Sequence, residues 1–297
     1  MKRIRQVFAI TCENFLKWDK NPRVYLTFFC AFLLCLMLSD EVLKVSKQYE
    51  TILQAFEPYI WTFGDSDSIL LSSLILLLLF ADMPFVDLST PYRLIRTNRN
   101  IWLIGQILYV FLGTVIYNIF LLVTEAAITA PRAYFGNVWS DTAALLAYGQ
   151  GSKVYHLPVS LKIMQNLSPY SCAVTVLLLM TIYSLFLMCS VLWINLHWGN
   201  VAGVIGGLSV SLYGFLIEPS VFQKMLQIPE RNMYKANALA VWLSPLNQAT
   251  FSMHSFGYDY LPSLQSSFLF FGILILIFLL LSCKAFRKYN FYFGEKR

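Results

Sequence analysis

The sequence predicts an all-α membrane protein with six transmembrane helices. Of its 297 residues, 58% are apolar and only 13% are charged, whereas soluble domains have about 45–50% apolar and about 25% charged residues. Sparse cysteines and abundant aromatic residues argue against a disulfide-rich secreted scaffold and a disordered chain. Because one span needs about 20 apolar residues, the chain has room for about six helices and for no large soluble domain besides them.

Six apolar runs are predicted to cross the membrane. The first begins clearly at Asn21, Pro22 and Arg23, but it is short, so we expect its missing residues to lie beyond Ser39. The fifth run is also near the lower length limit. The six runs are residues 24–39, 69–85, 101–125, 172–195, 200–216 and 266–283.

The distribution of charge predicts that both termini are cytoplasmic. Lys and Arg are enriched in cytoplasmic segments near the ends of spans. Most of the 22 basic residues lie in the N-terminal stretch, the loop between spans two and three, and the tail 284–297, whereas most carboxylates lie in the other loops. The segments expected outside are 40–68, 129–170 and 218–265, and loops of this length usually have structure or function of their own.

Residues 1–20 are predicted to form an interfacial helix that lies in the headgroup plane. Apolar residues recur there at three- and four-residue spacing, with basic residues around them, which is typical of such helices. The stretch lacks the uninterrupted apolar core of a signal peptide. The alternative is a basic flank that only orients the first span.

Two outer segments contain helical patterns. Apolar residues between Val42 and Phe56 have helical spacing, so this stretch either extends the first span or lies on the outer membrane surface. Pro219 can open a short helix through Leu226. The apolar stretch 238–251 is interrupted by Pro245 and is expected to be re-entrant or to rest on the membrane.

The sequence contains no recognisable catalytic or metal-binding motif. It has no G-x-x-x-x-G-K-[ST] phosphate loop, and its three histidines lack metal-ligand spacing, so we expect no ATP hydrolysis by this chain alone, no bound metal and no nucleic-acid partner. Asp82 lies near the cytoplasmic end of the second span, Glu125 at the outer end of the third, and Glu218 just past the fifth. We expect these groups to be hydrated at the membrane interface, which leaves no proton or sodium relay.

The fifth span is rich in glycine, with small residues four apart at Gly199, Gly203 and Gly207. Small residues allow helix backbones to approach closely in lipid. The spacing therefore indicates helix packing, either within the chain or at a dimer seam, or a flexible helix that moves during transport.

The loop after the second span predicts a short basic helix. Ser89 or Thr90 can cap its N-terminus, and Pro91 suits its first turn. Arg93 and Arg96 follow at a spacing of three. Such a helix can transmit force between two spans and a soluble partner; the alternative is a basic turn without a partner.

This layout resembles the permease subunit of an ABC-2-type ATP-binding-cassette exporter along the whole chain. In that family an elbow helix precedes six spans, a coupling helix follows span two, and short re-entrant helices lie between spans five and six; here these would be residues 1–20, 91–97 and 219–254. Residues 96–109 and Ser244-Pro245 are similar to segments of permeases found beside small ATPase subunits in Gram-positive bacteria. This coupling helix is basic, whereas many members have an acidic one, and the loop 129–170 is longer than usual.

The resemblance implies a transport function that needs partners. The chain would be a single ABC-2-type transmembrane domain over residues 1–297, non-catalytic by itself. It would pair in the lipid bilayer with a second copy or a related permease, and with ABC ATPase subunits that bind ATP and Mg. Its substrate would be amphipathic, such as a peptide antibiotic or toxin, a lipid or a drug. The residues of the ATPase-coupling helix would be Pro91, Tyr92, Arg93, Leu94, Ile95 and Arg96.

Within that helix, Tyr92, Leu94 and Ile95 are predicted to enter an ATPase groove, with the two arginines at its rim. Two other function classes stay open. A non-transport membrane scaffold or sensor would use the outer loops. A membrane-embedded enzyme would need polar side chains such as Gln106, Asn118 and Asn195 to converge near the middle of the membrane.

Overall fold

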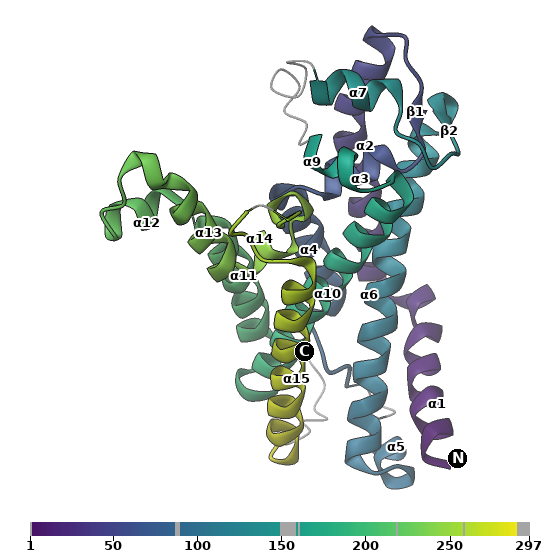
Figure 1. Cartoon of the computed structure of the whole chain (residues 1–297). Coiled ribbons are helices and arrows are strands. Elements are labelled where there is room, and N and C mark those ends of the chain that lie inside the picture. The colour runs from purple at the N-terminus through teal and green to yellow at the C-terminus, as the bar shows by residue number, and fades with distance from the viewer. Residues whose placement is uncertain are drawn as a thin grey trace.

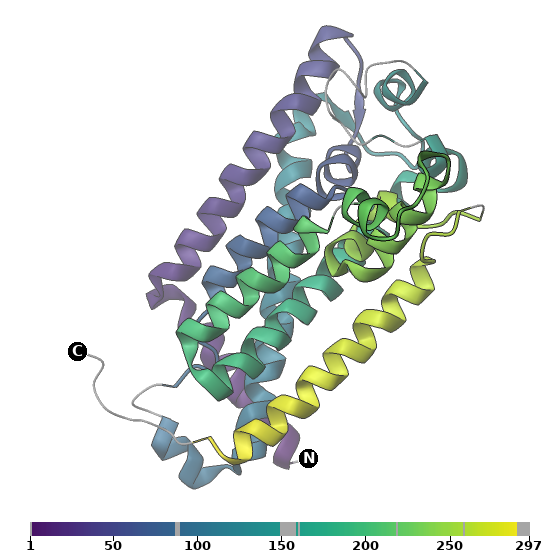
Figure 2. The ribbon, with the colours of Figure 1, turned by 90° about the vertical axis from the view of Figure 1, so that its left-hand side faces the viewer.

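Long helices make up most of the chain. The computed structural model describes residues 2–86, 90–148, 159, 161–217, 219–257 and 259–289, and it is about 82% helical with almost no strand. Figures 1 and 2 show the long helices running side by side as one bundle. The helices are α1 (Lys2–Leu16), α2 (Pro22–Gln48), α3 (Glu57–Phe63), α4 (Ser66–Phe80), α5 (Thr90–Arg96), α6 (Arg99–Thr129), α7 (Asp141–Tyr148), α9 (Leu161–Asn166), α10 (Pro169–Trp198), α11 (Asn200–Leu216), α12 (Pro219–Met225), α13 (Met233–Leu243), α14 (Pro245–Ala249) and α15 (Leu264–Arg287).

Four helices, α2, α6, α10 and α15, are long and apolar enough to cross a membrane. Two bent pairs pass the same test together: α3 with α4, bent by 86°, and α11 with α12, bent by 69°. The described residues therefore contain four candidate spans, or up to six if each bent pair is one span. The predicted all-α class is confirmed, with candidate membrane-spanning helices as its main elements.

Several predicted span limits need correction. The first span continues past Ser39 to Gln48, as expected, but the second predicted run, 69–85, stops being helical at Phe80. Pro84 follows, and a residue before proline is disfavoured in the helical region. The last helix extends to Arg287, into the predicted tail 284–297, because basic side chains interact favourably with the carbonyl end of a helix.

Helix α10 forms the centre of the bundle. Helices α3, α4, α6, α11 and α15 all pack on it, whereas α6 and α15 meet one another at few points. Its buried side chains include Met180, Tyr183 and Leu187, and the ring of Tyr183 packs on Phe271 of α15. The core therefore runs along α10, and α6 and α15 are held together mainly through it.

A small cap covers one end of the bundle, at the top of Figure 1. It contains the parallel strands β1 (Leu53–Gln54) and β2 (Ala133–Tyr134), together with α3, α7 and α9. The carboxylate of Glu57 is fully buried and accepts hydrogen bonds from the backbone N–H groups of Gln54, at 3.1 Å, and Ser140, at 2.7 Å. The Ser140 hydroxyl donates to the same carboxylate. Glu57 thus joins the start of α3 to the segment that leads into α7.

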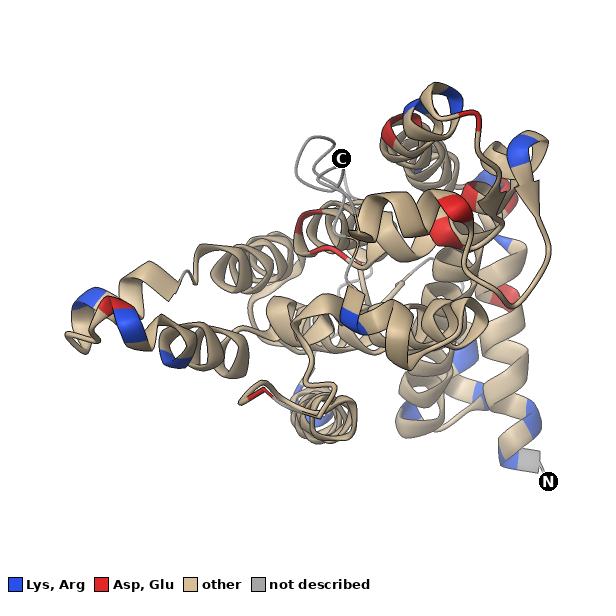
Figure 3. Ribbon diagram, turned by 45° about the horizontal axis from the view of Figure 1, so that its top comes forward, with Lys and Arg blue, Asp and Glu red and all other residues tan. Residues whose placement is uncertain are grey.

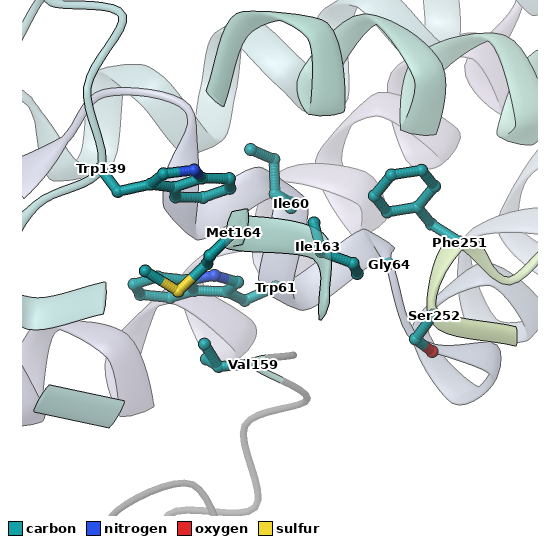
Figure 4. A pocket seen from close by; sticks show the side chains of 9 residues that line it. All are labelled: Ile60, Trp61, Gly64, Trp139, Val159, Ile163, Met164, Phe251 and Ser252. Atoms are coloured by element: carbon teal, nitrogen blue, oxygen red, sulfur yellow. The ribbon is translucent and has the colours of Figure 1, made fainter. Parts of the chain in front are cut away.

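A crevice in the cap is lined by aromatic and aliphatic side chains (Figure 4). The indoles of Trp61 and Trp139 lie at one end of it and Phe251 at the other. Its volume is about 10 Å³, which is room for about one water molecule. The crevice is a packing feature and too small for an organic ligand.

Helices α12 and α13 form an arm that extends sideways from the bundle (Figures 1 and 3). Its exposed basic residues are Lys224, Arg231 and Lys235. Helix α12 closely matches the short helix predicted from Pro219 to Leu226, and Pro245 separates α13 from α14. Glu218 lies outside the described residues.

Candidate functional site

The end of the bundle opposite the cap brings α1, α5 and the end of α15 together (Figures 1 and 2). The side chain of Gln6 donates to the backbone oxygen of Arg96 at 3.4 Å. The guanidinium of Arg99 donates to the backbone oxygen of Tyr289 at 2.9 Å. The N-terminal helix, the junction of α5 with α6 and the last described residue therefore share one face, which we call the α5 face.

Helix α1 contacts α6 closely at Gly105. A Cβ atom at that position would lie 2.8 Å from the Ile10 side chain, and the Thr11 hydroxyl donates to the Gly105 oxygen at 3.0 Å. Just beyond α1, the Trp18 indole N–H donates to the Tyr109 hydroxyl at 2.6 Å. One side of α1 is thus fixed to α6, whereas its other side exposes large apolar residues, namely Ile4, Phe8 and Leu16.

The predicted coupling helix exists as α5, from Thr90 to Arg96. Tyr92 and Ile95 are 73% and 83% exposed and point away from the core. Leu94, in contrast, is partly buried and packs against the chain's own core. The three apolar side chains of the predicted docking set are therefore divided between an outward and an inward side.

The two arginines of α5 also differ in their surroundings. Arg93 forms an ion pair with Glu13 of α1, and its side chain is only 15% exposed. Arg96 is exposed. Arg93 therefore joins α5 to α1, and only Arg96 presents its charge on the surface beside Tyr92 and Ile95. Residues 87–89, which contain the predicted cap Ser89, lie outside the described residues.

The glycines of the turn between α10 and α11 have different roles. Gly199 has φ 87, a backbone conformation that favours glycine, and a Cβ there would meet nothing within 4 Å. A Cβ at Gly203 would lie 1.5 Å from the Asn195 amide oxygen, and one at Gly207 would lie 2.8 Å from Val191. Gly203 and Gly207 are thus in close contact with α10 of the same chain, and Gly199 forms the turn.

A polar network at the same turn was not predicted from the sequence. The Asn195 amide donates to the backbone oxygens of Ala81, at 3.0 Å, and Met83, at 2.7 Å. Asp82 forms an ion pair with Arg23 at the start of α2 and accepts a hydrogen bond from Asn200 at the start of α11. The end of α4 is therefore held by α2, α10 and α11 together. These residues are far apart in the sequence, so no local pattern predicts that they meet.

The expectation of hydrated interfacial carboxylates is wrong for Glu125. This side chain is fully buried between α6 and α2, where the Ser39 hydroxyl donates to it. Its second oxygen has no hydrogen-bond partner among the described residues. Position along a helix placed Glu125 near the membrane surface, but it could not show that α2 continues beyond Ser39 and covers the carboxyl group.

The polar residues that an intramembrane enzyme would need to bring together lie at separate places. Asn118 donates to the Thr181 hydroxyl at 3.3 Å, whereas Asn195 binds the end of α4. Gln106 lies buried in α6, and its amide has no partner in the part of the chain that the structure describes. Across that same part, no group of three or more His, Cys, Asp and Glu side chains could hold a metal ion.

His254 lies between α14 and α15, where both of its ring nitrogens have polar neighbours. Its Nδ1 atom lies 3.0 Å from the Thr250 oxygen, and its Nε2 atom lies 3.1 Å from the Ser267 hydroxyl. Burial lowers the pKa of His254 against the opposing effect of the backbone oxygens. This ring therefore connects the segment after α14 to the start of α15.

The chain matches no family model, no curated protein and no solved structure.

Proposed function

We propose that this chain is the permease subunit of an ABC-2-type ATP-driven exporter. In this proposal the six spans are α2, α4, α6, α10, α11 and α15, and α3 and α12 belong to the cap and the arm outside the membrane. A separate ATPase binds the α5 face and supplies ATP hydrolysis. The observation that supports this most strongly is α5 itself, a short helix beside two spans that exposes Tyr92 and Ile95 to solvent.

The attachment of α5 is suited to the transmission of force. The Arg93–Glu13 ion pair and the Gln6 hydrogen bond hold it against α1, and Leu94 packs on the core. A partner that pushes on Tyr92 and Ile95 therefore pushes on α1 and α6 as well. A loose loop would absorb such a displacement.

Helix α1 runs alongside the first half of α6 (Figure 1), which differs from the in-plane helix that the sequence predicts, so its assignment as an elbow helix rests on its exposed apolar face. Its exposed large apolar residues are Ile4 and Phe8, four positions apart, and Leu16, eight positions further on, so they lie on the same side of the helix. Arg3, Arg5 and Lys17 lie near these residues in sequence. An apolar face beside basic side chains favours the headgroup region of a membrane.

The distribution of charge supports a cytoplasmic α5 face. Exposed basic residues at this end include Arg96, Arg99, Lys284 and Arg287, whereas acidic residues gather over the cap (Figure 3). Cytoplasmic segments near span ends are enriched in Lys and Arg. In this orientation the cap and the arm lie outside, and both ends of the chain are cytoplasmic.

The transported substrate in this proposal is amphipathic, such as a peptide antibiotic or toxin, a lipid or a drug. Apolar side chains dominate the exposed surfaces of the candidate spans, and no described metal cluster or phosphate loop suggests chemistry by this chain itself. The ATPase carries ATP and Mg, and a second copy or a related permease completes the translocation path.

The proposal can be tested by affinity capture of the tagged chain from detergent-solubilised membranes of its own source cells. Mass spectrometry is expected to identify a co-purifying ATPase with a phosphate loop. A variant with Tyr92→Asp and Ile95→Asp should lose this partner while remaining in the membrane, because two charges replace the exposed apolar contacts. Equal ATPase recovery with the variant would contradict the role of α5.

A matched control lies at the opposite end of the bundle. Phe135 and Val138 are also highly exposed apolar residues. A variant with Phe135→Asp and Val138→Asp carries the same change in charge, so it should retain the ATPase. Loss of the partner in both variants would indicate general damage to the chain.

A further inference from the structure

The buried carboxyl group of Glu125 lacks most of the partners that a carboxylate needs. The side chain is fully buried where α6 packs on α2, and one of its oxygens accepts a hydrogen bond from the Ser39 hydroxyl. The other oxygen has no hydrogen-bond partner among the described residues. None of the ion pairs that the structure describes includes Glu125. A negative charge here would therefore be buried with little compensation.

The titratable side chains that face Glu125 are Cys35 of α2 and Tyr59 of α3. The Cys35 sulfur lies 3.9 Å from the backbone oxygen of Leu121, one turn before Glu125. Ser39 follows Cys35 by one turn of α2, so the two helices meet at both levels. The Tyr59 hydroxyl donates to a methionine sulfur of α10 at 3.3 Å. A thiol, an alcohol and a phenol are neutral groups, so no cation balances the carboxyl group.

A proton is the ligand that suits this arrangement. A hard metal cation takes about six oxygen ligands, whereas the side-chain oxygens known to meet here are those of Ser39 and Glu125. A proton needs one oxygen atom and no cavity, and it removes the buried charge. With the proton between Glu125 and Ser39, the two groups share one hydrogen bond. The second carboxyl oxygen is then an uncharged carbonyl, which costs far less to bury than a charge.

We propose that Glu125 is a reversible proton-binding site and that its proton keeps α2 against α6. Release transfers the proton to water and leaves a carboxylate. Because a carboxylate needs hydration, the two helices then separate near Ser39 and admit water. The site lies beside the cap, since α6 ends at Thr129 and the chain continues directly into β2. Loss of the proton therefore loosens the packing next to the cap. The site is independent of the exporter proposal.

The test compares the melting temperatures of three full-length chains in phospholipid nanodiscs. The range is from about pH 5 to about pH 9, which includes the values documented for buried carboxyl groups. Glu125→Gln keeps the shape of the neutral carboxyl group and has no proton to lose. Glu41→Gln is the matched control, because Glu41 lies on the exposed side of α2. The third chain is unaltered.

The proposal fixes the sign of the pH dependence. A proton bound at this site by the folded chain alone stabilises the fold, and this stabilisation is lost as the pH rises. Glu125→Gln should therefore match the other two chains at the acidic end and exceed their melting temperatures by roughly 3 °C at the alkaline end. Parallel curves for all three chains, or a Glu125→Gln chain that is less stable at every pH, would overturn the proposal.

The same series in sodium and in potassium buffers distinguishes a proton from a metal cation. The curves of the unaltered chain should coincide in the two buffers, because the site has few oxygen ligands for a cation. A melting temperature that rises with sodium in the unaltered chain, but not in Glu125→Gln, would contradict the proton as the occupant.

A native thiol reports the separation of α2 from α6 directly. Cys35 and Cys172 are both fully buried free cysteines, and Cys35 faces Glu125 whereas Cys172 belongs to α10. At the alkaline end, N-ethylmaleimide should modify Cys35 about tenfold faster in the unaltered chain than in Glu125→Gln, the effect of one pH unit on a proton equilibrium. Cys172 should react equally in both chains, which controls for the titration of thiols themselves. Equal rates at Cys35 would overturn the proposal.

Discussion

Two buried carboxyl groups differ in the number of hydrogen-bond donors around them. Glu57 receives hydrogen bonds from Gln54 and from both the backbone and the hydroxyl of Ser140. Glu125 receives one from Ser39, and its other oxygen has no partner among the described residues. Burial raises the pKa of the Glu57 carboxyl group to about 7, against the opposing effect of its hydrogen bonds from Ser140 and Gln54. Glu57 therefore fastens the start of α3 to the segment before α7 through three hydrogen bonds, whereas Glu125 joins α6 to α2 through one.

Replacement of Glu57 is expected to destabilise the cap. Glu57→Ala removes the acceptor of three buried donors, which should lower the free energy of unfolding by roughly 3 kcal/mol. Glu41 lies on the exposed side of α2, and Glu41→Ala should change stability by less than about 0.5 kcal/mol. Thermal unfolding of the purified chains in detergent measures both effects. Equal melting temperatures of the two variants would show that Glu57 does not fasten the cap.

At the scale of elements, the hairpin of α10 and α11 is held by very close contact. Asn195 of α10 lies against Gly203 of α11 and also binds the end of α4. The packing glycines of this hairpin face their own chain, so the stripe at Gly203 and Gly207 is occupied by α10 and α4. The outer side of α11 exposes apolar residues such as Val201, Ile205 and Leu212 instead.

This hairpin predicts a difference between two identical substitutions. Gly203→Ala places a methyl group against Asn195 and should lower the free energy of unfolding by roughly 1–3 kcal/mol. At Gly272 of α15 an added Cβ meets nothing within 4 Å, so Gly272→Ala should raise the free energy of unfolding by up to about 1 kcal/mol, because alanine favours a helix more than glycine does. Thermal unfolding distinguishes the two. A neutral Gly203→Ala would contradict the close contact between α10 and α11.

The elements also show which features a sequence can predict. Long apolar runs located α6, α10, α11 and α15 to within a few residues, because burial in lipid or in the core requires a continuous apolar segment. The bend between α3 and α4 was missed, since the apolar residues Ile60, Trp61 and Phe63 belong to a separate short helix in the cap. Local patterns gave no information about this change of direction.

Contacts between distant segments were beyond prediction for a different reason. The α5 helix was located from its cap, its proline and its basic spacing, but its orientation depends on Glu13, which is far away in sequence. The inward position of Leu94 follows from that orientation. Similarly, the burial of Glu125 depends on how far α2 extends. Periodicity reports which side of a helix is apolar but not which partner covers it.

The two ends of the molecule differ in the charge of their exposed residues. The cap end is held by Glu57 and carries exposed acidic residues, whereas the opposite end carries α1, α5 and exposed basic residues (Figures 1 and 3). The central helix α10 connects the two ends and contacts most of the candidate spans. A force applied at α5 has a packed route through α6 and α10 toward the cap. In the exporter that we propose, this packed route connects the ATPase-binding end to the cap.

Photo-cross-linking from position 95 in intact cells tests the central claim most directly. Ile95 is exposed on α5, and its replacement by the photoreactive amino acid p-benzoylphenylalanine puts a short-range probe on the proposed docking surface. We predict a cross-link to a cytoplasmic ATPase that contains a phosphate loop, and no such cross-link from the same probe at Val138, at the cap end. Cross-links from position 95 to extracytoplasmic proteins alone, or from Val138 to the ATPase, would contradict it.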